Sequence, residues 1–495
     1  MKIDMPFEHS ETVDLALDTI KKDKQALIFV NTKNSAEKQA EDISKQIKNI
    51  DLEELSYEIL NVLPTPTKQC KRLADCIKRG IAFHHSGLNS KQRELIEDNF
   101  RTGAIKIICC TPTLAAGLDL PAFRAIIKDL KRFTSRGMQF IPVLEYLQMA
   151  GRAGRPKFDS VGEAICIAKS DSNNEEIYEK YIMGEPEDIY SKLAAEPVLR
   201  TYVLSLIASE LVGSKKELME FFEKTFFAHQ YEDMAQLNSL VMRVVGMLKD
   251  WEFISVESAD SETSDFTSAD FFGEETYKAT LLGKRISELY LDPYTASKLI
   301  DGLKNNKDKV EFSYLHLISN TLEMRPLLSV TKAESEDIEE KLELSREYIL
   351  DDEDFFEDYY TFMSSIKTAF FLEEWINEKD EDFLLTKFKV RPGEIKYKTN
   401  IADWLLYSCH ELAKLLMLKE QLSSIVKVRL RLQYGVKEEL LPLVKIKGIG
   451  KVRARKLFNN NIKDVRGLKK VDISSLKRIV GEKMGVNIKK QLLMG

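Results

Sequence analysis

Short apolar runs separated by longer polar segments dominate the first third of the chain. The apolar runs have the length of single strands and cover residues 26–30, 105–110, 125–127 and 161–168. The segments between them are polar with helical periodicity, as in residues 11–22 and in the stretch that ends at Ile47. Strands that alternate with helices in this way predict an α/β domain, with a parallel sheet covered by helices on both faces.

The pattern changes near Asp171, and the rest of the chain is predominantly helical. Residues 185–292 and 292–426 place apolar side chains mostly at helical spacing. A chain of 495 residues is long enough for three or four domains. The sequence therefore predicts a multidomain protein in which one α/β domain is followed by all-α domains.

The charge of the chain is divided unevenly along its length. Residues 427–495 contain 19 lysines and arginines against 5 aspartates and glutamates, a net charge of +14. The whole chain has a net charge of −6, so residues 1–426 carry −20. A basic end on an acidic chain is typical of a nucleic-acid contact, because lysine and arginine neutralise phosphates. A solvated basic tail is the alternative.

Cysteine usage and hydropathy indicate the compartment. The six cysteines, at positions 70, 76, 109, 110, 166 and 409, form no C-x-x-C pair. We therefore expect reduced thiols in a cytoplasmic protein, and no zinc or other metal site. Since the sequence has no apolar run of about 18 residues, we also expect no membrane partner.

Polar side chains follow two of the predicted strands. Asn31 and Thr32 come directly after the first apolar run, and Thr111-Pro112-Thr113 follows the second. The carboxyl ends of parallel strands meet at one edge of a sheet, where functional groups gather. We therefore expect both segments to lie at a common functional edge.

An arginine pair lies between a further apolar segment and the last predicted strand. Gln148-Met-Ala-Gly-Arg152-Ala-Gly-Arg155 places two arginines three residues apart among small side chains. Arginine is always charged and can bind a phosphate through two parallel hydrogen bonds, while glycine allows close approach of the backbone. The spacing and the flanking elements predict an ordered loop that binds a polyanion.

Together these segments resemble the motifs of the Ski-like superfamily 2 helicases, in particular their archaeal DNA-unwinding branch. Residues 148–155 resemble the last helicase motif of that family. Residues 29–32, 83–88 and 111–121 resemble motifs IV, IVa and V, in the family's order. The resemblance implies a second RecA-like helicase domain, which uses ATP with Mg²⁺ together with a first RecA-like domain.

The resemblance assigns roles at the nucleotide. Arg152 and Arg155 would be arginine fingers on the γ-phosphate, and Gln148 would help to position them. Gly117 and Asp119 would lie beside the nucleotide, although the family usually has Asn where this chain has Asp119. The residues of these motifs expected on DNA are Thr111, His85 and Ser86.

Residues 131–141 predict a β-hairpin around Ser135-Arg136-Gly137. In the family, a hairpin at this place separates the first base pairs of the duplex. Phe133 and Phe140, with Arg132 nearby, suit that role because apolar wedges unstack bases. A surface hairpin that packs on its own domain is the alternative.

The helical region resembles the family's winged helix and its ratchet bundle, in which one long helix touches single-stranded DNA. Trp404 corresponds by position to the family's base-stacking tryptophan. Two helical turns earlier, where the family commonly has Arg, this chain has Tyr397 between Lys396 and Lys398. Either Tyr397 stacks on a base or a flanking lysine contacts a phosphate, and a buried structural Trp404 is the alternative.

The basic tail contains a helix–hairpin–helix pattern at residues 443–457. Gly448 and Gly450 would form the hairpin and present backbone N–H groups to a phosphate at the start of a helix. Lys451 and Arg453 add positive charge there. This pattern predicts DNA binding without base reading.

Four domains follow from the pattern and the resemblance. They are a second RecA-like domain at residues 1–184, a winged helix at 185–291, a helical ratchet domain at 292–434 and a helix–hairpin–helix domain at 435–495. Residues 237–251, 253–256 and 277–289 would supply the helices and the wing strand of the winged helix.

A Walker A sequence, G-x-x-x-x-G-K-[ST], does not occur in the chain. The resemblance therefore implies the C-terminal portion of an ATP-dependent 3′-to-5′ DNA helicase, active in repair or at replication forks, that needs a partner polypeptide with the Walker motifs. The alternatives are a non-catalytic DNA-binding or regulatory module and an RNA helicase of the same group.

Overall fold

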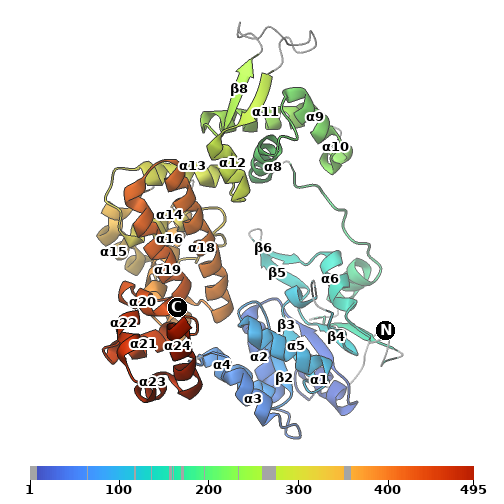
Figure 1. Cartoon of the computed structure of the whole chain (residues 1–495). Helices are drawn as coiled ribbons and strands as arrows, with labels where there is room; N and C mark the ends of the chain where they lie inside the picture. Colours follow the sequence, from blue (N-terminus) through green and yellow to red (C-terminus); the bar gives the residue numbers. More distant parts are fainter. Residues whose placement is uncertain are drawn as a thin grey trace. The chain divides into compact units, whose positions relative to one another are not determined.

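Five parallel strands form the sheet that was predicted for the first third of the chain, as a computed structural model shows (Figure 1). The strands are β1 Ala26–Phe29, β2 Ile81–His84, β3 Ile107–Cys110, β4 Arg124–Ile127 and β7 Glu163–Cys166. Their order across the sheet is β2-β3-β1-β4-β7, and every neighbouring pair is parallel. Four of these strands were predicted. Strand β2 was not, because only three apolar residues precede its histidines.

The structure describes residues 8–63, 65–115, 117, 119–134, 137–154, 159, 161–168, 172–193, 195–231, 234–258, 275–350 and 358–494. The chain divides into two units. We call Met1–Asp188 together with Asp380–Tyr397 the α/β unit, and Ile189–Lys379 together with Lys398–Gly495 the helical unit. A short segment from the predicted ratchet domain therefore belongs to the α/β unit.

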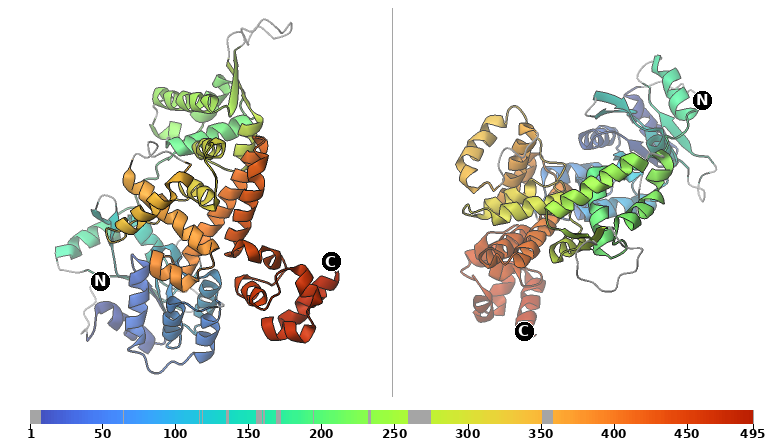
Figure 2. Two further views of the ribbon diagram at one scale, coloured as in Figure 1. Left: turned by 90° about the vertical axis from the view of Figure 1, so that its left-hand side faces the viewer. Right: turned by 90° about the horizontal axis from the view of Figure 1, so that it is seen from above.

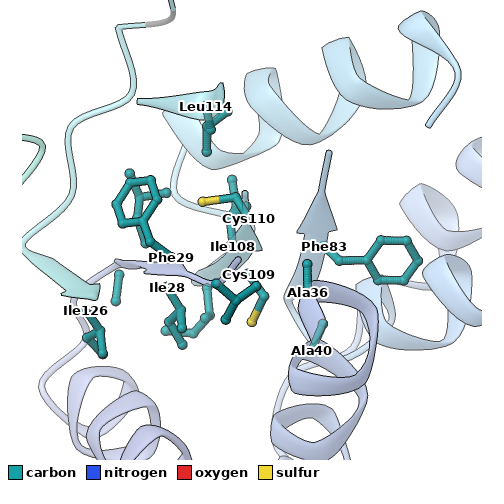
Figure 3. Close-up of a cluster of buried hydrophobic side chains, with 14 of the residues drawn as sticks. Ile28, Phe29, Ala36, Ala40, Phe83, Ile108, Cys109, Cys110, Leu114 and Ile126 are labelled. Carbon is teal, nitrogen blue, oxygen red and sulfur yellow. The ribbon is translucent and has the colours of Figure 1, made fainter. Parts of the chain in front are cut away.

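The helices of the α/β unit cover a sheet that is buried on both faces. Strands β1 to β4 have no exposed position, which is typical of a parallel sheet between two helical layers. Ala36 and Ala40 of α2 pack beside Phe83 and Cys109 of the strands (Figure 3). The helices are α1 Glu11–Lys21, α2 Lys33–Ser44, α3 Glu53–Leu60, α4 Lys68–Ile77, α5 Ser90–Arg101, α6 Val143–Ala150 and α7 Ser172–Ile177, followed by α17 Glu381–Phe388.

The hairpin predicted at residues 131–141 is present. Strands β5 Lys131–Thr134 and β6 Gly137–Phe140 pair in antiparallel register, with Phe133 opposite Met138. The predicted turn residues Ser135 and Arg136 lie outside the described residues.

The first part of the helical unit combines helices with a two-stranded hairpin. Its elements are α8 Glu196–Ala208, α9 Lys215–Glu223, α10 Phe226–Tyr231, α11 Met234–Asp250, β8 Ile254–Ser258, β9 Glu275–Ala279 and α12 Leu281–Glu288. Strands β8 and β9 are antiparallel; β8 lies where a strand was expected, at residues 253–256, whereas β9 was not expected. Tyr277 was expected in a helical segment but lies in β9, where its ring is buried.

A helical bundle follows. Its helices are α13 Pro293–Lys304, α14 Glu311–Ser319, α15 Ser335–Ser345, α16 Tyr359–Ile376, α18 Pro392–Leu415 and α19 Lys419–Tyr434. Phe362, Phe370 and Phe371 of α16 are buried, so these aromatic side chains belong to the core. Helix α18 is 24 residues long and begins in the α/β unit, from which it continues into the helical unit.

The basic C-terminal segment forms its own small core. Helices α20 Leu441–Val444, α21 Lys451–Asn459, α22 Val465–Lys470, α23 Ile473–Val480 and α24 Glu482–Met494 gather into one bundle, red in Figure 2. Leu443, Leu457, Leu468, Leu476 and Ile488 are fully buried within it. Among the described helices, none combines the length and the apolar character needed to cross a membrane.

Candidate functional site

The carboxyl ends of the central strands meet at one edge of the sheet, as predicted. Phe29 and His84, the last residues of β1 and β2, both pair with Cys110 at the end of β3. The next residue, Thr111, donates its backbone N–H to the His84 carbonyl oxygen at 3.4 Å, and its hydroxyl lies 2.9 Å from the Thr113 hydroxyl. Motifs IV, IVa and V therefore share one edge.

The loop that follows β3 and the loop that follows α6 are joined by backbone hydrogen bonds. Ala122 N–H donates to the Arg152 carbonyl oxygen at 2.9 Å, and Gly154 N–H donates to the Ala122 carbonyl oxygen at 2.7 Å. A Cβ atom on Gly162 would lie 2.3 Å from the Gly154 nitrogen, so the segment entering β7 needs glycine to pass this loop. The two loops form one structural unit around Arg152.

The Arg152 guanidinium is only partly engaged. Its Nε and one Nη both donate to the Ala115 carbonyl oxygen, with an Nε–O distance of 3.1 Å, and the nearest carboxylate oxygen among the described residues, on Asp119, is 3.9 Å away. The Asp119 side chain is 97% exposed. A guanidinium has five N–H donors, so Arg152 keeps donors for a phosphate.

The other predicted nucleotide residues lie at the same edge. Gln148, on α6, is exposed. Gly117 is also exposed, and a Cβ atom there would meet no atom within 4 Å. Arg155 lies outside the described residues. The described members of the set thus face open space around Arg152.

His85 was predicted to contact DNA, but the structure gives it an internal partner. Its ring is fully buried, its Nδ1 accepts the Gly87 N–H at 3.1 Å, and its Nε2 lies 3.2 Å from a Glu37 carboxylate oxygen. With Nδ1 as acceptor, Nε2 carries the proton and donates to Glu37. In this structure the His85 ring presents no atom to DNA, whereas the neighbouring Ser86 is exposed.

Glu37, which was not predicted, is the centre of this cluster. Burial raises the pKa of Glu37, but hydrogen bonds from His85, Gln69 and Arg391 outweigh burial and lower the pKa to about 2. Burial lowers the pKa of His85, so the ring is neutral. Only the tertiary structure brings Arg391 to Glu37, and the sequence carries no signal for this pair.

The hairpin presents one of its two predicted phenylalanines. The Phe133 side chain is 80% exposed, beside the exposed Met138 on the opposite strand. Phe140 instead packs on its own unit, with the Lys131 ammonium 4.0 Å from its ring centroid and Tyr181 in an edge contact. The described hairpin therefore exposes two apolar side chains, those of Phe133 and Met138.

Helix α18 separates the predicted DNA contacts into exposed and buried groups. Tyr397 is 54% exposed and Lys396 is exposed. Lys398 is buried, and its ammonium donates to the carbonyl oxygens of Met324 and Pro326, at 3.2 and 2.7 Å. Of the two flanking lysines, the structure therefore exposes Lys396 and engages Lys398 inside the protein.

Trp404 is half-buried on α18. Its indole N–H donates to the Leu289 carbonyl oxygen at 3.0 Å. This bond fixes the indole within the helical unit, as the structural alternative predicts, and leaves part of the ring accessible. The geometry is compatible with both interpretations of Trp404.

The helix–hairpin–helix has the predicted hairpin conformation. Gly448 has a φ of +92°, which favours glycine, and Gly450 directly precedes α21. Arg453 is exposed, and its guanidinium donates to the Gly448 carbonyl oxygen at 3.0 Å. Lys451 instead donates to the Lys379 carbonyl oxygen and lies 4.9 Å from the centroid of the Trp375 ring, which ties this hairpin to α16.

A second hairpin between α23 and α24 was missed. Gly481 has a φ of +93°, and a Cβ atom on Gly485 would lie 2.9 Å from the Lys477 backbone. The glycine spacing Gly481-Glu-Lys-Met-Gly485 was the available signal. Within the described ranges, no three His, Cys, Asp or Glu side chains cluster as a metal site would require.

Comparison with protein families identifies four consecutive matches. Residues 9–157 match the helicase conserved C-terminal domain, and residues 162–255 match a helix-turn-helix domain. Residues 312–435 match domain 4 of archaeal helicases, and residues 440–492 match a SAM-like helix-hairpin-helix tandem. The last match agrees with the two hairpins of the C-terminal bundle.

The chain is also similar along its length to curated proteins named ATP-dependent DNA helicase Hel308. The protein from Methanococcus vannielii is 38% identical over 518 residues, which cover 96% of this chain and 66% of the relative. Those from Pyrococcus abyssi and Methanocella arvoryzae are each 38% identical, covering 94% and 97% of this chain and 64% of each relative. The chain thus spans slightly less than two thirds of the length of these relatives.

Proposed function

Because the chain belongs to the Ski-like superfamily 2 helicases and corresponds to the C-terminal part of an archaeal DNA helicase, we propose that it works in ATP-driven, 3′-to-5′ unwinding of DNA. The names of its relatives support ATP and DNA as the ligands. The polarity and a role in repair or at replication forks rest on the family resemblance.

The observation that carries the proposal is the state of Arg152. Two loops, joined by backbone hydrogen bonds, hold this arginine at the functional edge of the sheet, and its contacts there do not use all of its donors. An arginine placed against the γ-phosphate stabilises the charge of the transition state and can raise the rate by about 10³–10⁵. Arg155, from the same motif, would be the second finger.

The exposed groups around Arg152 fit a nucleotide. Gly117 leaves space next to its backbone, and the side chains of Gln148 and Asp119 are exposed. ATP would bring the phosphoryl group to be transferred to water, and Mg²⁺ would neutralise its charge. In our proposal this chain positions Gln148, Gly117, Asp119 and Arg152 on one side of the nucleotide.

The opposite side would come from a first RecA-like domain. Because this sequence has no Walker A pattern, the phosphate-binding lysine must be supplied by residues outside it. We propose a domain of that type as the partner, either on a separate polypeptide or in a longer form of the chain.

The DNA contacts would follow from the exposed groups. Phe133 would enter the duplex as a wedge, and Tyr397 would stack on a base of the single strand, with Lys396 near a phosphate. Thr111 and Ser86 would contact the backbone at the sheet edge. The two glycine hairpins of the C-terminal bundle would hold further phosphates through backbone N–H groups.

ATP hydrolysis in the presence of single-stranded DNA tests the proposal. We expect no hydrolysis by the 495-residue chain alone, and hydrolysis when a polypeptide that carries the Walker motifs of a related helicase is added. Hydrolysis by the chain alone would show that it contains a nucleotide site of its own, which contradicts the proposed division. No hydrolysis in the mixture, with DNA binding intact, would reject the enzymatic role.

The C-terminal bundle favours a second candidate, a non-catalytic DNA-binding module. This bundle has its own core and the tandem hairpins, and the sequence from residue 427 onward carries a net charge of +14. A module of this kind would bind DNA equally well with and without ATP and after Arg152→Ala. Binding to matched DNA and RNA single strands would separate this candidate from an RNA-processing protein.

A further inference from the structure

The start of α18 is fixed to the α/β unit by a buried polar cluster around Glu37. We propose that Glu37 is a positioning residue, which holds the segment Arg391–Gly393, and with it the first turn of α18, against the rest of the α/β unit. The inference that this attachment serves movement on DNA rests on the proposed function; the attachment itself does not.

Glu37 is 2% exposed and binds cationic and neutral donors at the same time. Arg391 Nε donates to one carboxylate oxygen at 3.0 Å, and Arg72 donates to the other at 2.6 Å. Gln69 and His85 also hydrogen bond to Glu37, at 2.8 and 3.2 Å. A buried carboxylate is stable only when it is paired and hydrogen bonded, so removal of Arg391 from this place is costly.

The backbones of the two segments also touch directly. Gly393 N–H donates to the Gly87 carbonyl oxygen at 3.0 Å. A Cβ atom on Gly393 would lie 2.2 Å from the Ser86 carbonyl oxygen, and one on Gly87 would lie 2.4 Å from the Arg391 side chain. The contact therefore needs glycine on both sides and joins motif IVa to the first turn of α18.

Polar contacts on both sides extend the attachment. Asp382, in α17, accepts the Lys68 backbone N–H at 3.0 Å. Glu394 accepts the Arg391 backbone N–H at 2.9 Å and pairs with Lys33 of α2. The contacts thus include residues from the first turns of α17, α18, α2 and α4, and a single bond does not carry the attachment alone.

This attachment has a mechanical consequence. Trp404 follows Gly393 by 11 residues, about 16 Å along a continuous helix. Tyr397 lies between them, one turn after the attachment. A helix fixed at its first turn holds Tyr397 in a set position on the α/β unit, whereas a loose first turn does not.

Hydrogen exchange on the whole 495-residue chain tests the attachment. We expect Glu37→Gln to raise amide exchange in residues 380–397 by about tenfold, since an uncharged amide replaces the buried carboxylate. Glu41→Gln is the matched control, because Glu41 lies one turn later on α2 and binds the same Arg72 without touching Arg391. Exchange in β3 reports whether the sheet remains folded.

A glycine variant tests the same contact without changing its charge. Gly393→Ala should raise exchange in the same segment, because its Cβ meets backbone that cannot move aside easily. Gly246→Ala, where a Cβ meets no atom within 4 Å, is the control. Unchanged exchange at residues 380–397 in both Glu37→Gln and Gly393→Ala would overturn the attachment.

The positioning role requires a second readout, in the mixture that contains the Walker polypeptide. We expect Glu37→Gln to keep DNA-stimulated ATP hydrolysis within about twofold and to lower the duplex separated per ATP by about tenfold or more. An unchanged ratio of unwinding to hydrolysis would overturn the positioning role. If the unmodified mixture does not hydrolyse ATP, the proposed function fails, and with it the positioning role, whereas the exchange result still decides the attachment.

Discussion

Arg152 and Arg391 are two arginines of the α/β unit with opposite environments. Arg391 binds Glu37 and Asn34 and has a side chain that is 14% exposed, and the Glu37 it binds is shared with three other donors. Arg152 is 23% exposed and binds a neutral carbonyl oxygen, with a solvent-exposed carboxylate 3.9 Å away. The difference in exposure is small, whereas the difference in paired charge is large.

This comparison distinguishes an arginine that holds two segments of the protein together from an arginine that can act on a ligand. A buried carboxylate fixes Arg391 at one distance and uses its charge inside the protein. Among the described residues, the charge of Arg152 has no buried counterpart, so it remains available to a phosphate. Paired charge distinguishes the two roles better than burial does.

Replacement of Arg152 should give the largest effect on activity. In the mixture with the Walker polypeptide, we expect Arg152→Ala to lower ATP hydrolysis by about 10³ or more, because the transition-state charge loses its cation. The thermal stability of the chain should change little, since both guanidinium hydrogen bonds go to the same Ala115 carbonyl oxygen and each is worth about 1 kcal/mol. Arg101→Ala, which removes an exposed helix pair with Asp98, should leave hydrolysis unchanged.

Replacement of Arg391, in contrast to that of Arg152, should mainly affect stability. We expect Arg391→Ala to destabilise the α/β unit by about 2 kcal/mol or more, because it removes a cationic partner from the buried carboxylate of Glu37. The three tryptophans, Trp251, Trp375 and Trp404, all belong to the helical unit, so their fluorescence reports only that unit. Circular dichroism in denaturant should therefore reveal an earlier transition that fluorescence does not follow. Coincident, unshifted transitions would contradict the anchor role.

Acid should lower the stability of both units, because each contains a buried histidine. Burial lowers the pKa of His85 in the α/β unit, and burial lowers the pKa of His316 in the helical unit to about 3. Both rings are neutral in the folded chain but take up a proton near pH 6.5 when unfolded, so stability is lost as the pH falls below 6.5. Glu37, with a pKa of about 2, adds a further loss between about pH 4.5 and 2 in the α/β unit, and Glu334, with a pKa also lowered to about 2, adds one in the helical unit.

His316 in the helical unit allows the predicted loss of stability at low pH to be checked directly. Phe312 and Phe362 flank His316, which makes one hydrogen bond, to Ser365 at 3.3 Å. His316→Phe should flatten the pH dependence of stability measured by tryptophan fluorescence between pH 6.5 and 3. Circular dichroism of the α/β unit should keep its acid dependence, since His85 and Glu37 are unchanged. An unaltered fluorescence profile would show that His316 does not control acid sensitivity.

The sequence predicted the elements whose signals are local. Four strands were found because apolar runs of strand length are bounded by polar residues, and the first glycine hairpin of the tail was found because its pattern coincides with basic charge. Strand β2 was missed because it ends at His84 and is followed by His85. The burial of these two polar side chains depends on their hydrogen bonds to Glu97 and Glu37. Strand β9 was missed because three of its five residues also fit the helical segment that follows.

The attachment of α18 could not be predicted in the same way. Glu37 and Arg391 lie 354 positions apart, and neither belongs to a recognisable motif. A sequence shows the spacing of residues within one helix or strand, whereas this cluster forms only when α2, α4 and the start of α18 meet. The same limit explains why Lys396 and Lys398 could not be distinguished, although the structure exposes one and buries the other.

The smallest effect that we predict concerns these two lysines, of which Lys396 is exposed and Lys398 is buried. Lys396→Ala should weaken binding of single-stranded DNA slightly and reduce the slope of log affinity against log salt by about 0.7, as expected for one lost phosphate contact. Lys398→Ala should leave that slope unchanged and should lower the stability of the helical unit, because the Met324 and Pro326 carbonyl oxygens lose a buried donor. Salt titration of DNA binding and tryptophan fluorescence in denaturant measure the two outcomes. If Lys398→Ala changed the salt slope and Lys396→Ala did not, α18 would turn a different face to DNA, and exposure in this structure would be a poor guide to which of the two lysines contacts it.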